Sequence, residues 1–149
     1  RRRASYSHAM RAHRLLAGLA TASALLLSAC SMQADRQLAE AAIPAFHQQL
    51  DAGRFDAIYD VAADDLKRAA PRSDFTRFLA AVHRKLGVTQ SSVPRGWQIN
   101  VQTSGTYVTL TVATVFAGGA AQERFVYRLQ DKQARLAGYN INSNALILQ

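Results

Sequence analysis

The sequence predicts an α+β domain in which three helices come first and a four-stranded antiparallel meander follows. Apolar residues recur about every four positions up to Gly87 and alternate with polar residues after Val88, and these spacings are typical of helices and strands respectively. Glycine and proline interrupt the pattern where elements are expected to end. Because helices and strands are segregated along the chain, we expect the helices to pack on one face of the sheet.

Three helices are predicted before residue 88. The first carries an apolar stripe made by Leu38, Ala42, Phe46 and Leu50. Pro44 is expected to kink this helix or to reset its first turn, and Gly53 is expected to stop it. The second helix is predicted from a stripe of Phe55, Ile58, Tyr59, Ala62 and Leu66. Ser73 is expected to cap a third helix that ends at Gly87. Its inward residues are Phe75, Leu79, Val82 and Leu86.

Four strands are predicted after residue 88. The first three direct these residues to one face: Trp97, Ile99 and Val101; Val108, Leu110, Val112 and Phe116; Phe125, Tyr127 and Leu129. The turns between strands are expected at Ser104-Gly105, at Gly118-Gly119 and at residues 131–134. In the last strand Leu136 is out of phase with Tyr139 and Ile141, so a bulge is predicted at Gly138.

The segment before Cys30 has the order of a secretory signal. Arg11, His13 and Arg14 supply positive charge, and thirteen uncharged residues follow from Leu15 to Leu27. The four residues that end at Cys30, Leu-Ser-Ala-Cys, resemble the lipobox of bacterial lipoproteins. This resemblance implies export, cleavage before Cys30 and acylation of its sulfur. The alternative is an ordinary secretory signal with a chance cysteine.

The chain is accordingly divided into three parts. Residues 1–29 are upstream residues and signal peptide, with Met10 as the expected start, residues 30–34 are the lipidated cysteine and tether, and residues 35–149 are one α+β domain. Thirteen helical residues would span only about 20 Å, against a hydrocarbon core of about 30 Å, so covalent lipid is the expected anchor. In the lipoproteins that this chain resembles, Ser31 after the cysteine favours the periplasmic face of the outer membrane.

Charge and residue usage exclude several function classes. The chain has 18 Lys and Arg, 10 Asp and Glu and a net charge of +8. Five of the basic residues and none of the acids precede Cys30, so the mature part is only +3. Its basic residues are scattered, and nucleic-acid binding is therefore not expected. No nucleophile, metalloprotease or phosphate-loop motif occurs in the sequence, so no catalytic, metal or cofactor site is predicted.

Three segments carry a second resemblance: Leu50-Asp51-Ala52-Gly53-Arg54-Phe55, Leu86-Gly87 and Arg135-Leu136-Ala137-Gly138-Tyr139-Asn140-Ile141. With the order of elements, they resemble the cystatin-like roll of the nuclear-transport-factor-like superfamily. The closest likeness is to small bacterial lipoproteins that carry an uncharacterised domain of this type, over about residues 35–143. The resemblance implies a cone between the helices and the sheet, whose mouth binds ligands in superfamily members. These members include both enzymes and binding modules, so the fold alone does not choose a function.

Five residues are candidates for a ligand pocket at such a mouth: Tyr59, Trp97, Arg128, Tyr139 and Asn140. The alternative, which their residue types favour, is that the aromatic rings fill the core. His47 and His83 are expected to be partly exposed on helix flanks. Three carboxylates, Asp60, Asp64 and Asp65, are expected to form a solvated surface with weak ion pairs.

These observations predict an envelope protein anchored in the lipid bilayer through acylated Cys30. Its domain is expected to bind a partner protein or a small ligand without catalysis. The alternative is a small enzyme of the isomerase or dehydratase type that uses the cone as its active site. The outer face of the sheet, which carries Arg124, Val126 and Arg128, is expected either to be solvated or to form a homodimer.

Overall fold

The computed structural model describes residues 31–147 and contains helices followed by a four-stranded sheet. The first helix covers residues 31–51, and three more follow: α2 (Phe55–Asp60), α3 (Asp64–Ala69) and α4 (Arg72–Leu86). The strands are β1 (Thr89–Gln102), β2 (Gly105–Phe116), β3 (Gly119–Gln130) and β4 (Gln133–Asn142), and a short helix, α5 (Asn144–Ile147), comes last. All neighbouring strands pair antiparallel in the order β1-β2-β3-β4. The predicted α+β class and meander are therefore confirmed, while the signal segment and Cys30 lie outside the described residues.

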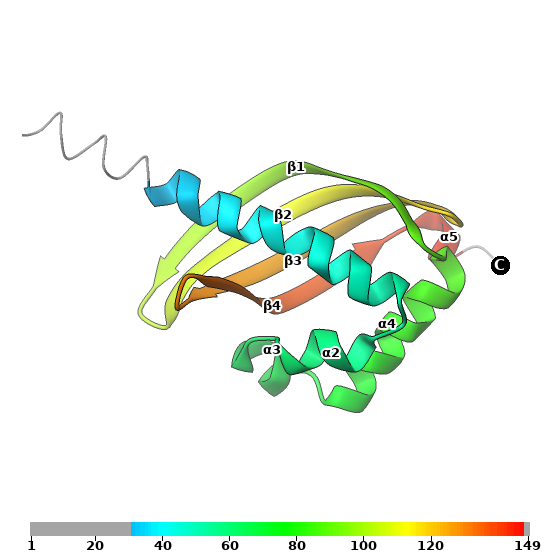
Figure 1. Cartoon of the computed structure of the whole chain (residues 1–149), viewed down its shortest axis with the longest axis horizontal. Coiled ribbons are helices and arrows are strands. Elements are labelled where there is room, and N and C mark those ends of the chain that lie inside the picture. The colour runs from blue at the N-terminus through cyan, green and yellow to red at the C-terminus, as the bar shows by residue number, and fades with distance from the viewer. Residues whose placement is uncertain (1–30, 148–149) are drawn as a thin grey trace, which may run out of the picture. The chain divides into compact units, whose positions relative to one another are not determined.

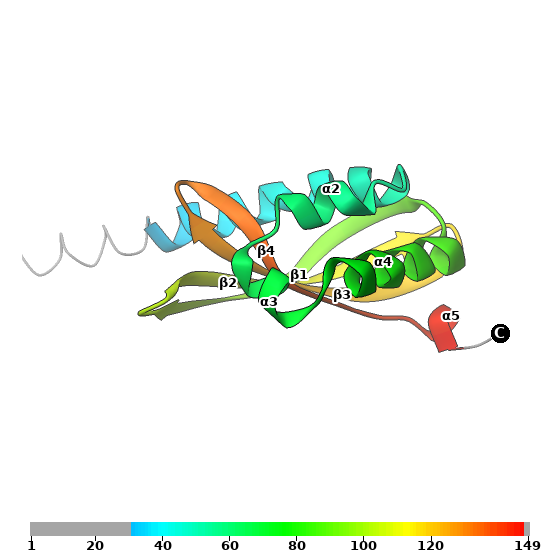
Figure 2. The ribbon, with the colours of Figure 1, turned by 90° about the horizontal axis from the view of Figure 1, so that it is seen from below.

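The first helix crosses one face of the sheet (Figure 1). In the view turned by 90°, α2 lies on the same side of the sheet as the first helix (Figure 2). Farther along, α3 packs against β4, and α2 packs against α4. Between residues 31 and 147, no helix is both long and apolar enough to cross a membrane.

The sheet contributes the inward face that the sequence predicted for its two central strands. Val108, Leu110 and Val112 of β2 are fully buried, and Phe125 of β3 lies opposite Leu110. The first helix meets them with Ala39, Ile43, Phe46 and Leu50. Only the second half of this stripe matches the prediction. A strict four-residue step drifts around a helix of 3.6 residues per turn, which leaves Leu38 and Ala42 half-buried at its border.

Two helix predictions, the undivided second helix and the cap at Ser73, were wrong, and one of the two alternatives for Pro44 is excluded. Pro44 does not reset the first helix, which continues through it. Proline lacks an N–H, so one backbone hydrogen bond of the helix is lost. Pro44 is exposed, and this loss therefore falls on the solvent side of the helix. The predicted second helix is two short helices, because residues 61–63 leave the helical path and the amide of Ala63 donates to the carbonyl of Leu136 on β4 (2.9 Å). Ser73 is not the cap of α4, which begins at Arg72 after an extended Pro71.

The turns and the bulge follow the sequence closely. Gly87 ends α4 with a φ of 72°, a conformation that favours glycine. Asp131 and Lys132 both have positive φ between β3 and β4, as a two-residue primed turn requires. The bulge in β4 falls at Ala137, one residue before the predicted Gly138. It brings Leu136 and Tyr139 to the same face of the sheet.

The core lies within one compact unit, Asp35–Gln149. Every buried apolar residue of the described chain lies between Ala39 and Leu136. We therefore expect a chain of residues 33–149 to be soluble and to unfold cooperatively.

Substitution of single core leucines tests this packing. Leu79 and Leu110 have no exposed surface, so Leu79→Ala and Leu110→Ala are each expected to lower the free energy of unfolding by about 2–5 kcal/mol. Chemical denaturation of residues 33–149 measures the effect. Val101→Ala is the control, because Val101 is 77% exposed and should change stability by less than about 0.5 kcal/mol. Losses that small at both leucines would reject the assigned core.

Candidate functional site

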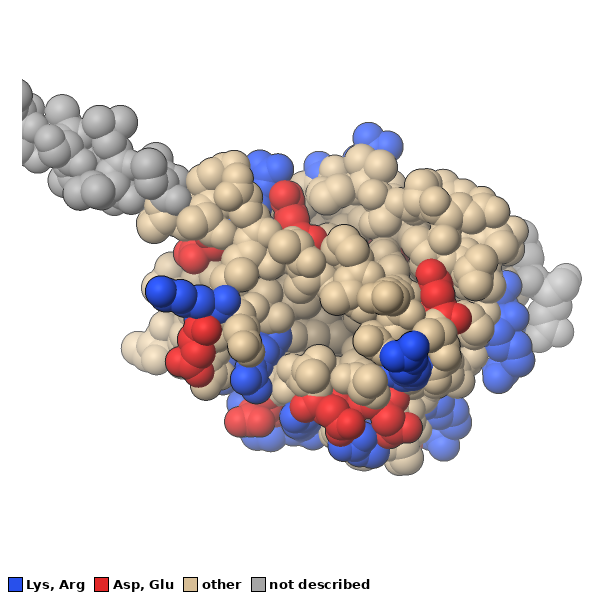
Figure 3. All heavy atoms as spheres, in the orientation of Figure 1, with Lys and Arg blue, Asp and Glu red and all other residues tan. Residues whose placement is uncertain are grey.

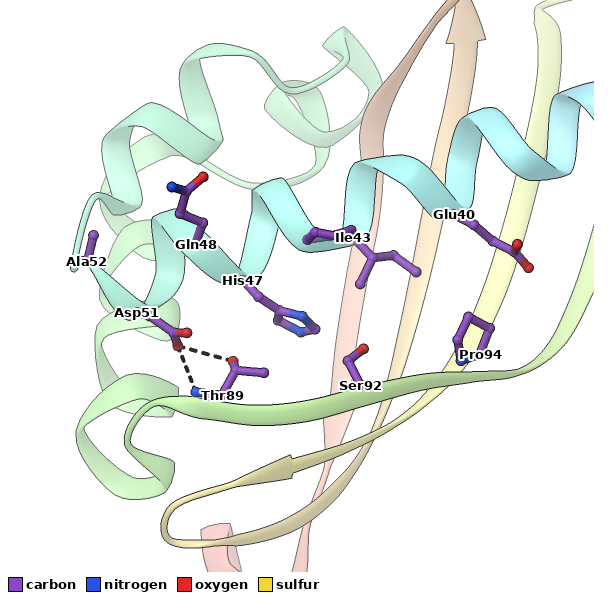
Figure 4. Close-up of a pocket in the computed structure, with 10 residues that line it drawn as sticks. Glu40, Ile43, His47, Gln48, Asp51, Ala52, Thr89, Ser92 and Pro94 are labelled. Carbon is purple, nitrogen blue, oxygen red and sulfur yellow. Dashed lines mark hydrogen bonds between the residues drawn. The ribbon is translucent and has the colours of Figure 1, made fainter.

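A groove of about 680 Å³ separates the first helix from β1 (Figure 4). The helix lines it with Glu40, Ile43, Pro44, His47, Gln48, Asp51 and Ala52, and the strand lines it with Thr89, Ser92 and Pro94. The volume lies within the range of about 300–1,000 Å³ that is usual for small-molecule sites.

The spacing of the lining residues explains how the two elements form this groove. On the helix they recur at three- and four-residue steps, so they share one face. On β1, Ser92 and Pro94 are two residues apart and therefore point to the same side of the strand. Pro44 also removes one helix hydrogen bond from the wall of the groove. Proline lacks the N–H that would otherwise bond the carbonyl of Glu40.

A buried carboxylate lies in the core behind the groove. Glu123 of β3 has no exposed surface. Its Oε2 accepts hydrogen bonds from Nε2 of His47 (2.8 Å) and from the Thr114 hydroxyl, and its Oε1 accepts one from the Tyr139 hydroxyl (2.6 Å). An ionised carboxylate only accepts, so the bond to His47 is made by the form of the ring that carries a proton on Nε2. We call these four residues the Glu123 network.

The Glu123 network holds one residue of the groove, His47, in place. Burial, reinforced by the negative charge of Glu123, raises the pKa of Tyr139 well above its usual value, so its hydroxyl stays a donor. The His47 ring is packed edge-on against Phe46, Phe116 and Phe125. His47 is thereby held in one orientation while it lines the groove.

The exposure expected for His47 was wrong. His47 is only 5% exposed, because the first helix turns its ring toward the carboxylate of Glu123 on β3. His83 is half-buried on α4 and packs near the Phe55 ring. The two histidines therefore do not share a site.

At each end of the groove, side-chain contacts join the first helix to β1. At one end, Oδ1 of Asp51 accepts from the amide (3.0 Å) and the hydroxyl (3.1 Å) of Thr89 (Figure 4). Toward the other end, Glu40 pairs with Arg36 (2.8 Å), whose guanidinium lies 5.6 Å from the centre of the Trp97 ring. These contacts hold the helix and the edge strand at a fixed separation.

The five pocket candidates from the sequence are not brought together. Tyr59 is buried and donates to the carbonyl of Ala70 (3.0 Å). Trp97 lies 45% exposed on the edge strand. Tyr139 belongs to the Glu123 network. Asn140 is exposed on the opposite face of β4, where it lies across from Arg124 of β3 in the strand register. None of them lines the groove.

Arg128, the fifth candidate, is held in an ion pair away from the groove. Its guanidinium lies 3.0 Å from the Asp65 carboxylate and also donates to the carbonyl of Ser104. Partial burial acts to raise the pKa of Asp65, but the hydrogen bond and charge of Arg128 outweigh it and lower that pKa. Asp60 pairs with Arg72 at the exposed surface. Asp60 and Asp65 thus form ion pairs, as the sequence indicated for the carboxylates of this region.

Sequence reasoning missed Glu123, although a signal for it was present. Glu123 is two residues before Phe125 and four before Tyr127, so the alternation that placed those rings inward also places this carboxylate inward. A charged residue at an inward strand position needs partners. The partner on the first helix could be identified only once the helix was docked on the sheet.

The groove offers hydrogen bonding more than bond-making chemistry. Within residues 31–147, no three His, Cys, Asp or Glu side chains cluster as metal ligands would. Glu123 already accepts three hydrogen bonds inside the protein. The one feature with catalytic character is His47, because a histidine oriented by a carboxylate is a common general base.

Comparison with models of known protein families and with curated proteins finds no match to this chain.

Proposed function

We propose that this protein is a lipid-anchored envelope lipoprotein whose domain binds a small ligand in the groove between the first helix and β1. The observation that carries the proposal is the groove itself, which is open to solvent and has His47 held in one orientation by the Glu123 network. Such pre-organisation favours binding because little side-chain freedom is lost when the ligand arrives.

The lining residues restrict the ligand. Two carboxylates, Glu40 and Asp51, line the groove, and no lysine or arginine does. An anionic ligand finds no lysine or arginine partner there, so we expect a neutral or cationic one. Ile43, Pro44 and Pro94 supply apolar surface, while Ser92 and Thr89 carry hydroxyls. The expected ligand therefore has an apolar body and at least one hydrogen-bonding or cationic group.

The anchor contributes by placing the domain at a membrane. The lipobox resemblance at Cys30 and the short connection to residue 35 support attachment close to the bilayer, on the periplasmic face of the outer membrane. Confinement to this layer raises the effective concentration of the domain toward other envelope components. A modest affinity in the groove is then sufficient. The resemblance to lipoproteins with a nuclear-transport-factor-like roll agrees with this reading.

Two adjacent serines on β1 allow a matched test. Ser92 is paired with Thr114 and lines the groove, whereas Ser91 is paired with Val115 on the other face of the sheet. Ser92→Phe is expected to fill the groove and to abolish ligand binding, and Ser91→Phe is expected to leave it unchanged. The three proteins are purified from native membranes, and small molecules released from each are compared by mass spectrometry.

The expected result is a compound that is present with the wild type and with Ser91→Phe and missing with Ser92→Phe. Thermal unfolding of all three proteins verifies that each is folded. Equal recovery of the same compound from Ser92→Phe would contradict the proposal.

An enzyme is the second candidate, and the bond between His47 and Glu123 is the observation that favours it. If the groove is an active site of the isomerase or dehydratase type, the recovered compound should be converted on incubation with the protein. His47→Gln should then stop conversion in a variant that still binds. Recovery of the compound unchanged from the wild type supports binding alone.

A further inference from the structure

A second chamber lies on the other side of the first helix, and it is independent of the groove. Its volume is about 250 Å³. The first helix, α2 and the two last strands line it with Ala42, Ala45, Phe46, Gln49, Ala57, Ile58, Val61, Tyr127, Ala134 and Leu136. None of these residues lines the groove. Figure 3 shows a hollow of uncharged atoms between the first helix and the α2–α3 region, on the face seen in Figure 1.

Two buried polar atoms on lining residues have no hydrogen-bond partner within residues 31–147. They are the hydroxyl of Tyr127 and Oε1 of Gln49. Tyr127 is only 2% exposed, and its ring stacks on Phe125. A buried donor or acceptor without a partner is costly, commonly by about 1–3 kcal/mol. Such groups are therefore expected to meet a ligand or ordered water.

The two atoms have complementary roles. Burial, reinforced by the nearby charge of Glu123, raises the pKa of Tyr127 far above its usual value, so its hydroxyl remains a donor. Oε1 of Gln49 is an acceptor. A ligand hydroxyl, like a water molecule, can accept from the first and donate to the second.

The remaining lining excludes charged ligands. Apart from these two residues it consists of alanine, valine, isoleucine, leucine and phenylalanine, and an ion placed there would be unpaired. One water molecule finds its two partners in Tyr127 and Gln49, but the walls offer no polar partners for the further water molecules that would fill the volume. An apolar cavity of about 150 Å³ suffices for benzene, so this one accepts a ring or short chain with a substituent.

We propose that this chamber is a second binding site, which takes an uncharged, mostly apolar molecule of about ten non-hydrogen atoms with a single hydroxyl group. The hydroxyl lies between Tyr127 and Gln49, and the apolar body packs against the alanines of the first helix and α2.

The probes are 4-methylphenol and 1,4-dimethylbenzene, which have the same shape and differ by one hydroxyl. The chain is used as isolated from membranes, in lipid nanodiscs, and the methyl resonances of Ala42, Ala45 and Ala57 are followed by NMR during titration. We expect saturable shifts with 4-methylphenol and at least about tenfold weaker binding of 1,4-dimethylbenzene, since the two hydrogen bonds of the hydroxyl are lost.

Three variants separate this site from binding elsewhere. Tyr127→Phe removes only the unpaired hydroxyl, so it should fold normally and bind 4-methylphenol more weakly than the wild type does, since only the bond to Gln49 remains. Ala42→Leu fills the chamber and should abolish saturable shifts, whereas Ala41→Leu, on the exposed side of the helix, should not. Equal affinity of the wild type for both probes, unchanged 4-methylphenol binding in Tyr127→Phe, or a chamber that holds only water at saturating probe would overturn the proposal. Ser92→Phe should leave probe binding in the chamber intact. A failure of the chamber proposal can therefore be distinguished from a failure of the groove proposal.

Discussion

Glu123→Ala is expected to lower the free energy of unfolding by about 3–5 kcal/mol, because each buried polar group that loses its partner commonly costs about 1–3 kcal/mol. The substitution leaves the His47 ring, the Thr114 hydroxyl and the Tyr139 hydroxyl without their shared acceptor in a region closed to solvent. It also opens a cavity beside Phe125. Since small domains are stable by only about 5–15 kcal/mol, this single change would remove a large share of the total.

Denaturant titration of residues 33–149 measures the loss. The neighbouring Arg124→Ala is the control, because Arg124 is exposed on the other face of the same strand and should change stability by less than about 0.5 kcal/mol. A second arm pairs Glu123→Ala with Tyr139→Phe. Because the two residues share a hydrogen bond, their effects should be less than additive. A loss below about 1 kcal/mol for Glu123→Ala, or strict additivity, would show that the network contributes little.

Much of the fold was predictable because it depends on local periodicity. Alternation placed Val108, Leu110 and Phe125 on the inward face, and the left-handed turn at Asp131 and Lys132 fell where the sequence required one. The phase change after Leu136 also predicted a bulge to within one residue. Each of these features is decided by a few neighbouring residues.

The errors arose where tertiary contacts overrule the local pattern. The predicted second helix is broken because the amide of Ala63 bonds to β4 instead of to its own helix. Ile43, rather than Ala42, faces the sheet, because the docking angle of the first helix sets which side is buried. His47 was assigned to a helix flank for the same reason.

The groove could not be assembled from the sequence. Its residues lie on two segments about forty positions apart, and most are ordinary surface types such as Gln48 and Ser92. The aromatic residues that seemed better candidates are distributed instead. Tyr59 is in the core, Trp97 is on the sheet edge, and Tyr139 bonds to Glu123. Residue type alone does not separate a ring that binds a ligand from one that fills a core.

Cys30→Ser is expected to prevent lipidation and to remove the protein from the mature membrane fraction. The lipoprotein peptidase acts on the acylated cysteine, so the variant should keep its signal segment. Intact-mass measurement of membrane-extracted protein decides the outcome, because the wild type should begin at Cys30 and carry the mass of three acyl chains. An unmodified Cys30 thiol on a soluble mature chain would contradict the prediction.

The consequence for function is tested by separating the anchor from the fold. When Cys30→Ser is combined with an ordinary cleavable secretory signal, the released domain should fold with unchanged stability, because its core lies between Ala39 and Leu136. It should retain the groove and yet fail to restore a deletion strain, since release would dilute the domain away from the membrane layer in which we propose that it acts. Thermal unfolding and complementation are measured on the same protein. Full complementation by the released domain would show that the groove acts without the membrane, and the role proposed for the anchor would then be wrong.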